Sequence, residues 1–194
     1  CAVVAQTPFH RLAASPVIVH DQRATPRFYV ATEQSLRLAA GKAIWGASTI
    51  YDSFRTPPGA TATILLCPRG REGALVRVPL PAPFEVAFHV INAFDEGPDR
   101  VVVDLVVYGG RIGFSAAGSK ALRDRTGAHP SDGPTPTPTR FVVDVAAGRV
   151  VETKKLGDSP GEAPEVSDSV MGAPSRFAYF PTTRPEADLP DRGG

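Results

Sequence analysis

Short runs of apolar, β-branched and aromatic residues recur along almost the whole chain. Runs of this length that are rich in Val, Ile, Phe and Tyr are typical of β-strands. Nine of them are expected as strands, at residues 16–20, 27–32, 61–67, 74–80, 86–94, 101–108, 140–145, 149–156 and 176–180. The pattern therefore predicts an all-β fold.

Residues that favour turns separate these runs. The segment 56–59 reads Thr-Pro-Pro-Gly, a Gly-Gly pair follows the run at 101–108, and Ala147 and Gly148 separate two runs as a tight hairpin. Because short connections join antiparallel neighbours, hairpins and meanders are the expected links between strands.

Three segments depart from the strand pattern. Residues 33–40 (EQSLRLAA) are good helix formers closed by Gly41, and are expected as a short turn of helix or a loop. Residues 119–139 are polar and rich in Pro, Gly and Thr, and are expected as a surface loop. Residues 181–194 mix Pro, Gly and both charges, and are expected as a disordered tail.

Composition excludes several classes of protein. With 18 Gly and 20 Pro in 194 residues, a helical bundle and a coiled coil are excluded. The 21 basic residues nearly balance the 20 acidic ones, and a net charge of +1 argues against a nucleic-acid partner. No apolar run approaches the roughly 18 residues that a membrane-spanning helix needs.

Two of the four histidines lie in apolar runs. His20 follows Val17-Ile18-Val19, and His89 interrupts the run at 86–94, whereas His10 and His129 lie in polar stretches. A buried imidazole needs a partner for each ring nitrogen. Either histidine alone is explained by a hydrogen bond to a backbone carbonyl in the core, but inward-facing histidines on two strands are better explained by a shared Fe, Zn or Cu ion.

The sequence segments around these histidines resemble those of the carotenoid cleavage oxygenases. The segment FHVINAFDEGPDRVVVDLVVYG (88–109) resembles the signature in which Phe-His precedes Asn-Ala, an aromatic residue, acidic residues and a Val-rich strand. Upstream, SPVIVHDQRATPRFYV (15–30) looks like the family's apolar strand with His-Asp. Downstream, 139–166 and SRFAYF (175–180) look like its hairpin, Glu-x-Pro turn and aromatic strand.

The resemblance implies a fold and a metal site. It implies that the chain forms about two to three blades of a seven-bladed β-propeller with iron on its axis. Residue by residue, His20 and His89 match two of the family's four iron-binding histidines. Glu162 matches a glutamate that accepts a hydrogen bond from a ligand histidine.

The resemblance also implies a reaction. Fe(II) and dioxygen would cleave a conjugated carbon–carbon double bond of a carotenoid, apocarotenoid or stilbene, giving two carbonyl products. The partners would be an apolar conjugated small molecule and dioxygen, and no protein acid, base or nucleophile is required.

The two other ligand histidines of the family are expected outside this chain. Residues 1–194 are therefore expected as one partial domain, a fragment without activity of its own. Contact with a membrane would come from segments outside the chain, so the expected location is the cytoplasm or the periphery of a membrane.

Two alternatives remain. A non-catalytic β-propeller or β-sandwich binding module would use His20 and His89 as ordinary core residues. An iron-free, degenerate member of the family would explain why Gln22-Arg23 and Ala163 replace aromatic residues at their family positions.

Overall fold

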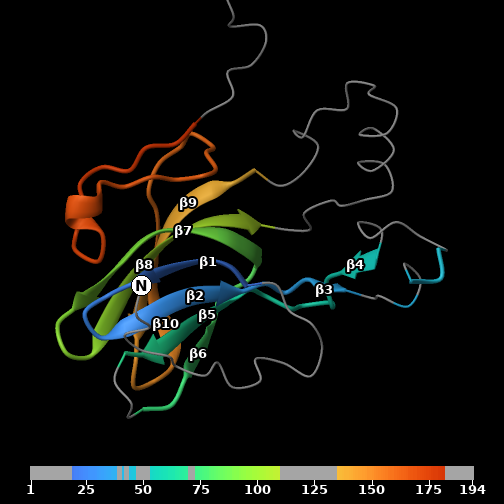
Figure 1. The fold of residues 1–194 in the computed structure, drawn as a ribbon, viewed down its shortest axis with the longest axis horizontal. Coiled ribbons are helices and arrows are strands. Elements are labelled where there is room, and N and C mark those ends of the chain that lie inside the picture. The colour runs from blue at the N-terminus through green and yellow to red at the C-terminus, as the bar shows by residue number, and fades with distance from the viewer. Residues whose placement is uncertain are drawn as a thin grey trace, which may run out of the picture.

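The computed structural model describes residues 19–38, 41, 44–46, 53–69, 73–109 and 135–181 (Figure 1). Within these ranges the chain is all-β, as predicted, and its main elements are two four-stranded antiparallel sheets. The first sheet has the order β1-β2-β5-β6, with β1 (Val19–Ala24), β2 (Phe28–Glu33), β5 (Thr63–Pro68) and β6 (Val76–Pro79). The second has the order β10-β9-β8-β7, with β7 (Phe84–Glu96), β8 (Arg100–Gly109), β9 (Thr137–Asp144) and β10 (Arg149–Lys155).

The two sheets share one apolar core. Side chains from β2, β5 and β6 pack against side chains from β7, β8 and β9, among them the fully buried Val30, Ile64, Leu66, Val78, Val90, Val103, Leu105, Phe141 and Val143. Burial of this apolar surface is the main force that holds the sheets together.

The second sheet is covered on its other face as well. The segment 157–181, which contains the short 3-10 helix η3 (Asp168–Val170), runs across β7 and β8 (Figure 1). Its Val166 packs against Ile91 and Val106, with Ala178 and Phe180 alongside. Because β8 is covered on both faces, it reads as the apolar runs Val101–Val103 and Leu105–Val107, interrupted only by Asp104, and does not alternate.

Polar side chains tie the first sheet to β7 at several points. The fully buried Gln34 side chain pairs with the backbone of Ala87: its Oε1 accepts from the Ala87 N–H at 2.7 Å, and its Nε2 donates to the Ala87 carbonyl at 2.5 Å. The hydroxyl of Thr32 donates to the same carbonyl at 2.7 Å. The amide of Gln34 thus pairs with β7 as a neighbouring strand would.

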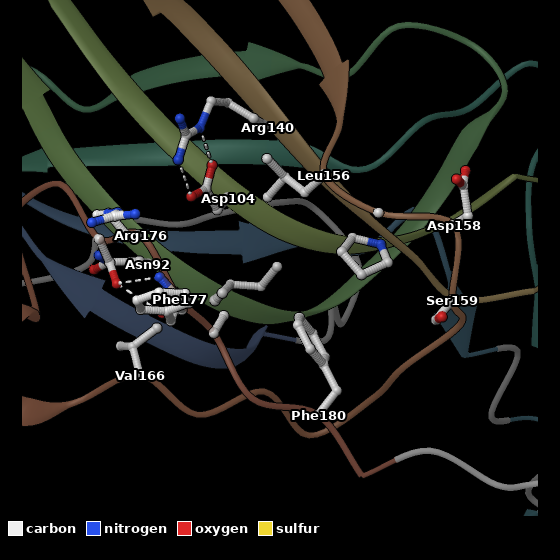
Figure 2. Close-up of a pocket in the computed structure, with 15 residues that line it drawn as sticks. Asn92, Asp104, Arg140, Leu156, Asp158, Ser159, Val166, Arg176, Phe177 and Phe180 are labelled. Atoms are coloured by element: carbon white, nitrogen blue, oxygen red, sulfur yellow. Dashed lines mark hydrogen bonds and ion pairs between the residues drawn. The ribbon is translucent and has the colours of Figure 1, made fainter.

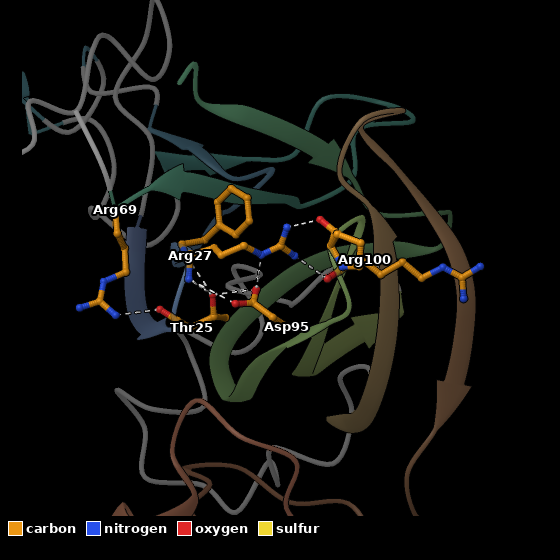
Figure 3. A network of polar contacts seen from close by, with 7 residues as sticks. Thr25, Arg27, Arg69, Asp95 and Arg100 are labelled. Carbon is orange, nitrogen blue, oxygen red and sulfur yellow. Dashed lines mark hydrogen bonds and ion pairs between the residues drawn. The ribbon is translucent and has the colours of Figure 1, made fainter. Parts of the chain in front are cut away.

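A second set of polar contacts between the first sheet and β7 lies at the turn between β1 and β2 (Figure 3). The carboxylate of Asp95 accepts hydrogen bonds from the Thr25 hydroxyl at 3.0 Å and from the Arg27 N–H at 3.2 Å. The Arg27 guanidinium then donates to the Arg100 carbonyl at 2.9 Å, and Arg69 donates to the Thr25 carbonyl at 2.9 Å. These bonds fix the end of β7 against the first sheet.

Of the two expectations for 33–40, a short turn of helix or a loop, the helical turn is not found in residues 33–38. Glu33 ends β2, and β3 (Arg37–Leu38) pairs with β4 (Phe54–Arg55) in a two-stranded sheet. Leu36 is buried, and Gln34 is held by Ala87. Tertiary pairing therefore overrides the weak helix propensity of this short segment.

Strand boundaries also differ from the predictions, and the first strand, expected at 16–20, runs on to Ala24 as part of β1. β9 begins at Thr137, because Thr137, Pro138 and Thr139 find partners on β8, so the expected loop 119–139 ends inside the sheet. The expected strand 176–180 is reduced to one bridge between Glu165 and Tyr179. The remainder of that loop up to residue 134, the tail from residue 182, and residues 1–18 lie outside the described residues. No helix in the described ranges is long and apolar enough to cross a membrane.

Candidate functional site

The two histidines singled out by the sequence lie side by side. His20 is on β1 and His89 is on β7, and their ring centroids are 5.1 Å apart with the rings at 68°. These strands belong to different sheets. They are joined by the Asp21 carboxylate, whose Oδ2 accepts a hydrogen bond of 2.9 Å from the Val90 N–H.

Neither histidine is a core residue in the described structure. His20 is exposed, and the His89 side chain is 27% exposed. The alternative in which both are ordinary core histidines bonded to backbone carbonyls does not match these positions.

Glu162 lies against His89. Its Oε2 is hydrogen-bonded to the His89 Nδ1, and it also accepts from the Ala163 N–H at 3.2 Å. A carboxylate oxygen accepts, so Nδ1 of His89 carries the proton of this bond, and in the neutral imidazole Nε2 then has the free lone pair. The resemblance predicts that Glu162 accepts a hydrogen bond from a ligand histidine without saying which one, and in the structure its partner is His89, 73 residues away.

The second oxygen of Glu162 has its own donor. The hydroxyl of Tyr108, near the end of β8, donates to Glu162 Oε1. Burial raises the pKa of Tyr108 far above the ordinary tyrosine value of 10.0, and the hydrogen bond to Glu162 and its negative charge act in the same direction. Tyr108 is therefore a neutral hydroxyl donor at any ordinary pH.

An aromatic side chain flanks the histidines. Phe88 makes edge contacts with His20, at 5.7 Å between ring centroids, and with Tyr108, at 6.4 Å. Beside the histidines lies a hollow of about 310 Å³ lined by His20, Asp21, Arg23, His89, Ala163, Pro164 and Glu165.

The donor set of this hollow suits a metal ion in part. Neutral imidazole is a ligand for Fe, Zn and Cu, and a ligand histidine usually donates its other N–H to a carboxylate, as His89 does. Within the described ranges no group of three or more His, Cys, Asp or Glu side chains could hold a metal. The two histidines alone therefore do not complete a metal site within the part of the chain that the structure describes.

A second cavity, of about 350 Å³, lies between the outer face of the second sheet and the segment 157–181 (Figure 2). Asp104 and Arg140 lie in its lining as a bidentate ion pair with two contacts of 2.8 Å. The hydrogen bond to Asp104 raises the pKa of Arg140 above its ordinary value. This cavity contains neither histidine.

Three residues around the site were missed from the sequence. Tyr108 read as the last residue of an apolar strand, Asp21 as a flanking position of a motif, and Gln34 as part of a helical turn. The one local signal was at Tyr108, which places a polar hydroxyl group at the end of a Val-rich strand. The partners of the other two come from distant parts of the chain.

Comparison with known proteins identifies relatives of this chain. The family described as Retinal pigment epithelial membrane protein matches residues 2–192. No curated protein matches.

Solved structures share the fold. An apocarotenoid oxygenase variant from Synechocystis is 24% identical with a TM-score of 0.69, over 86% of this chain and 33% of that chain. A cobalt-substituted form from the same organism has a TM-score of 0.68 at 24% identity, with the same coverage. A chimera named ACO/RPE65 has a TM-score of 0.70 at 24% identity, over 87% of this chain and 33% of that chain. The chain thus spans about a third of the length of the structures that it matches.

Proposed function

The chain belongs to the carotenoid cleavage oxygenase family, and on that premise we propose that the whole protein is an Fe(II)-dependent oxygenase that cleaves a conjugated double bond. The substrate would be a carotenoid, apocarotenoid or stilbene. One oxygen atom of dioxygen goes to each carbon of the broken bond, which gives two carbonyl products. The observation that carries the proposal is the pairing of His20 and His89 at 5.1 Å, with Glu162 on the Nδ1 of His89.

The two four-stranded sheets would be adjacent blades of a β-propeller. Each sheet is an antiparallel meander that follows chain order, and a propeller blade is a four-stranded sheet of this kind. The first strands of the two sheets, β1 and β7, are linked through Asp21 and Val90. Because the first strands of the two sheets meet in this way, the axis of the propeller would lie beside the two histidines.

His20 and His89 would hold the metal ion through imidazole nitrogens. For His89 the coordinating atom is Nε2, because Nδ1 is engaged by Glu162. The further ligands would come from parts of the protein outside the described residues. One of the structures that share the fold is described as cobalt-substituted, which supports a metal in the family.

A ferrous ion held there would supply redox chemistry towards dioxygen that no amino-acid side chain provides. The side chains of this chain have supporting roles. Glu162 keeps the proton on Nδ1 of His89, Phe88 presents an apolar edge beside His20, and Asp21 holds the two histidine strands together. None of them needs to exchange a proton with the substrate.

The test is the metal content of the purified full-length protein and of two variants, His20→Ala and His89→Ala. We expect about one iron per chain in the wild type and loss of the iron in both variants, since each variant would lack one of the ligands. The variants His10→Ala and His129→Ala, at histidines to which the sequence assigns no ligand role, are the controls and should keep the iron.

A full-length protein without iron, or one whose iron survives both His20→Ala and His89→Ala, would overturn the proposal. The first result favours the iron-free family member. With iron present, cleavage of a polyene is followed as loss of its visible absorbance under oxygen, and this should be absent in the His89→Ala protein.

A further inference from the structure

We propose that Tyr108 is a positioning residue that fixes the protonation and orientation of His89 through Glu162. The inference rests on the proposed function, because it concerns how the same site presents a ligand nitrogen. It assigns a role to the Tyr108 hydroxyl that neither the sequence motifs nor the strand pattern indicates.

The register of the second sheet places Tyr108 on the correct face. His89 of β7 lies opposite Val106 of β8, so both side chains are on one face of the sheet. Tyr108 is two residues beyond Val106, and alternation along a strand returns it to that face. The Glu162 carboxylate lies over the same face, between the Tyr108 hydroxyl and the His89 ring.

Glu162 needs such a support because it comes from an irregular segment. It lies in the stretch between β10 and η3, where no strand partner holds its backbone. Its side chain is 29% exposed, so water could compete for either oxygen. The Tyr108 hydroxyl occupies Oε1 and thereby holds Oε2 on His89.

The consequence concerns which nitrogen of His89 is protonated. A neutral imidazole interconverts between two tautomers, and the hydrogen bond at one nitrogen decides which one is present. When Glu162 is held by Tyr108, the Nδ1–H tautomer is favoured and Nε2 of the neutral imidazole keeps its lone pair for a ligand. Without the hydroxyl, Glu162 can turn toward water and the tautomers mix.

The ring of Tyr108 has a separate, structural role. It packs beside Val106, Ile91 and Val166 and touches Phe88. The variant Tyr108→Phe keeps this ring and removes only the hydroxyl. Tyr179→Phe is the matched control, because Tyr179 is 67% exposed and lies outside the contacts of the site.

The experiment uses the metal-free full-length protein labelled with ¹⁵N-histidine, in which ring-nitrogen chemical shifts report the tautomer of His89. We expect the Nδ1–H form in the wild type and in Tyr179→Phe, and a mixture in Tyr108→Phe. Glu162→Gln should give the same mixture. The double variant Tyr108→Phe/Glu162→Gln should change nothing further, because both substitutions break one connected path.

A second measurement is the affinity for Co²⁺, used as a spectroscopic probe. We expect Tyr108→Phe to weaken it about tenfold, the lower end of what loss of a partner behind a ligand histidine costs. An unchanged His89 tautomer in Tyr108→Phe would overturn the inference. A tautomer change in a protein that binds no Co²⁺ would support the role of Tyr108 and count against the metal-dependent function, so the two ideas fail separately.

Discussion

The carboxylate of Asp21 accepts a hydrogen bond of 2.9 Å from the backbone N–H of Val90, and each of these residues directly follows one of the paired histidines. The bond crosses from the first sheet to the second. Asp21 also accepts from the Gln22 N–H at 2.7 Å and from Arg23 at 3.0 Å, so its carboxylate is held from both sides. One side chain thus sets the spacing of the two histidine strands.

Replacing Asp21 with alanine should lower the free energy of unfolding by about 1–3 kcal/mol, because it leaves the buried Val90 N–H without a partner. Urea unfolding of the full-length protein measures this change. Asp158→Ala is the control, since Asp158 is fully exposed and its ion pair among the described residues is with Lys155, and it should leave the stability nearly unchanged. Equal effects of the two substitutions would argue against the strand link.

Arg140→Ala should lower the free energy of unfolding by more than Asp21→Ala does. It leaves the Asp104 carboxylate, 8% exposed, without its bidentate partner, and it removes the guanidinium that lies 5.4 Å from the centre of the Phe94 ring. Breaking a buried ion pair in this way costs about 3–5 kcal/mol. Thermal unfolding measures the loss.

The control for that substitution is Arg100→Ala, because Arg100 and its partner Glu96 are both more than half exposed and 3.9 Å apart. It should cost about 1 kcal/mol or less. Adding Asp104→Asn to Arg140→Ala should recover part of the lost stability, because the unpaired charge is then removed. If the double variant were less stable than Arg140→Ala alone, charge burial would not be the cause.

Gly161→Ala should disturb the segment that carries Glu162. A Cβ at Gly161 would lie 2.7 Å from the Cβ of Phe180, so the ring or the backbone has to move. Such overpacking costs about 1–3 kcal/mol. Differential scanning calorimetry compares it with Gly157→Ala, where a Cβ meets open space and the stability should change by less than about 0.5 kcal/mol. A Gly161→Ala protein as stable as the control would show that Phe180 yields freely.

Tyr108 should make the protein less stable at alkaline pH. Its pKa in the folded protein lies above the ordinary 10.0, so above that pH the unfolded chain loses a proton that the folded chain keeps. The stabilising contribution is complete below pH 10 and declines as the pH rises towards the folded pKa. Unfolding free energies of the wild type, Tyr108→Phe and Tyr179→Phe, measured from about pH 8 to about pH 11, test this.

The stability difference should change with pH in one specific direction. The stability advantage of the wild type over Tyr108→Phe should shrink as the pH passes 10. A constant advantage over Tyr108→Phe would mean that the hydroxyl titrates alike in the folded and unfolded chains.

Much of the fold was predictable because its cause is local. The apolar runs and turn residues located eight of the strands, since a pleated strand between two turns needs only a few neighbouring residues to define it. The failures at 33–38 and 176–180 come from segments whose state depends on distant partners. The side-chain amide of Gln34 is held by Ala87, 53 residues away, whose carbonyl accepts from it and whose N–H donates to it.

The motifs around His20, His89 and Glu162 were enough to single out these three residues and the family of the chain, because each motif lies within a short stretch of sequence. Sequence alone left open how they are supported. Tyr108 on Glu162 and Asp21 on Val90 join segments 54 and 69 residues apart, and such contacts exist only once two sheets share a core. Hydrogen-bond geometry depends on positions in space, which strand register and sheet packing determine and which spacing along the chain does not.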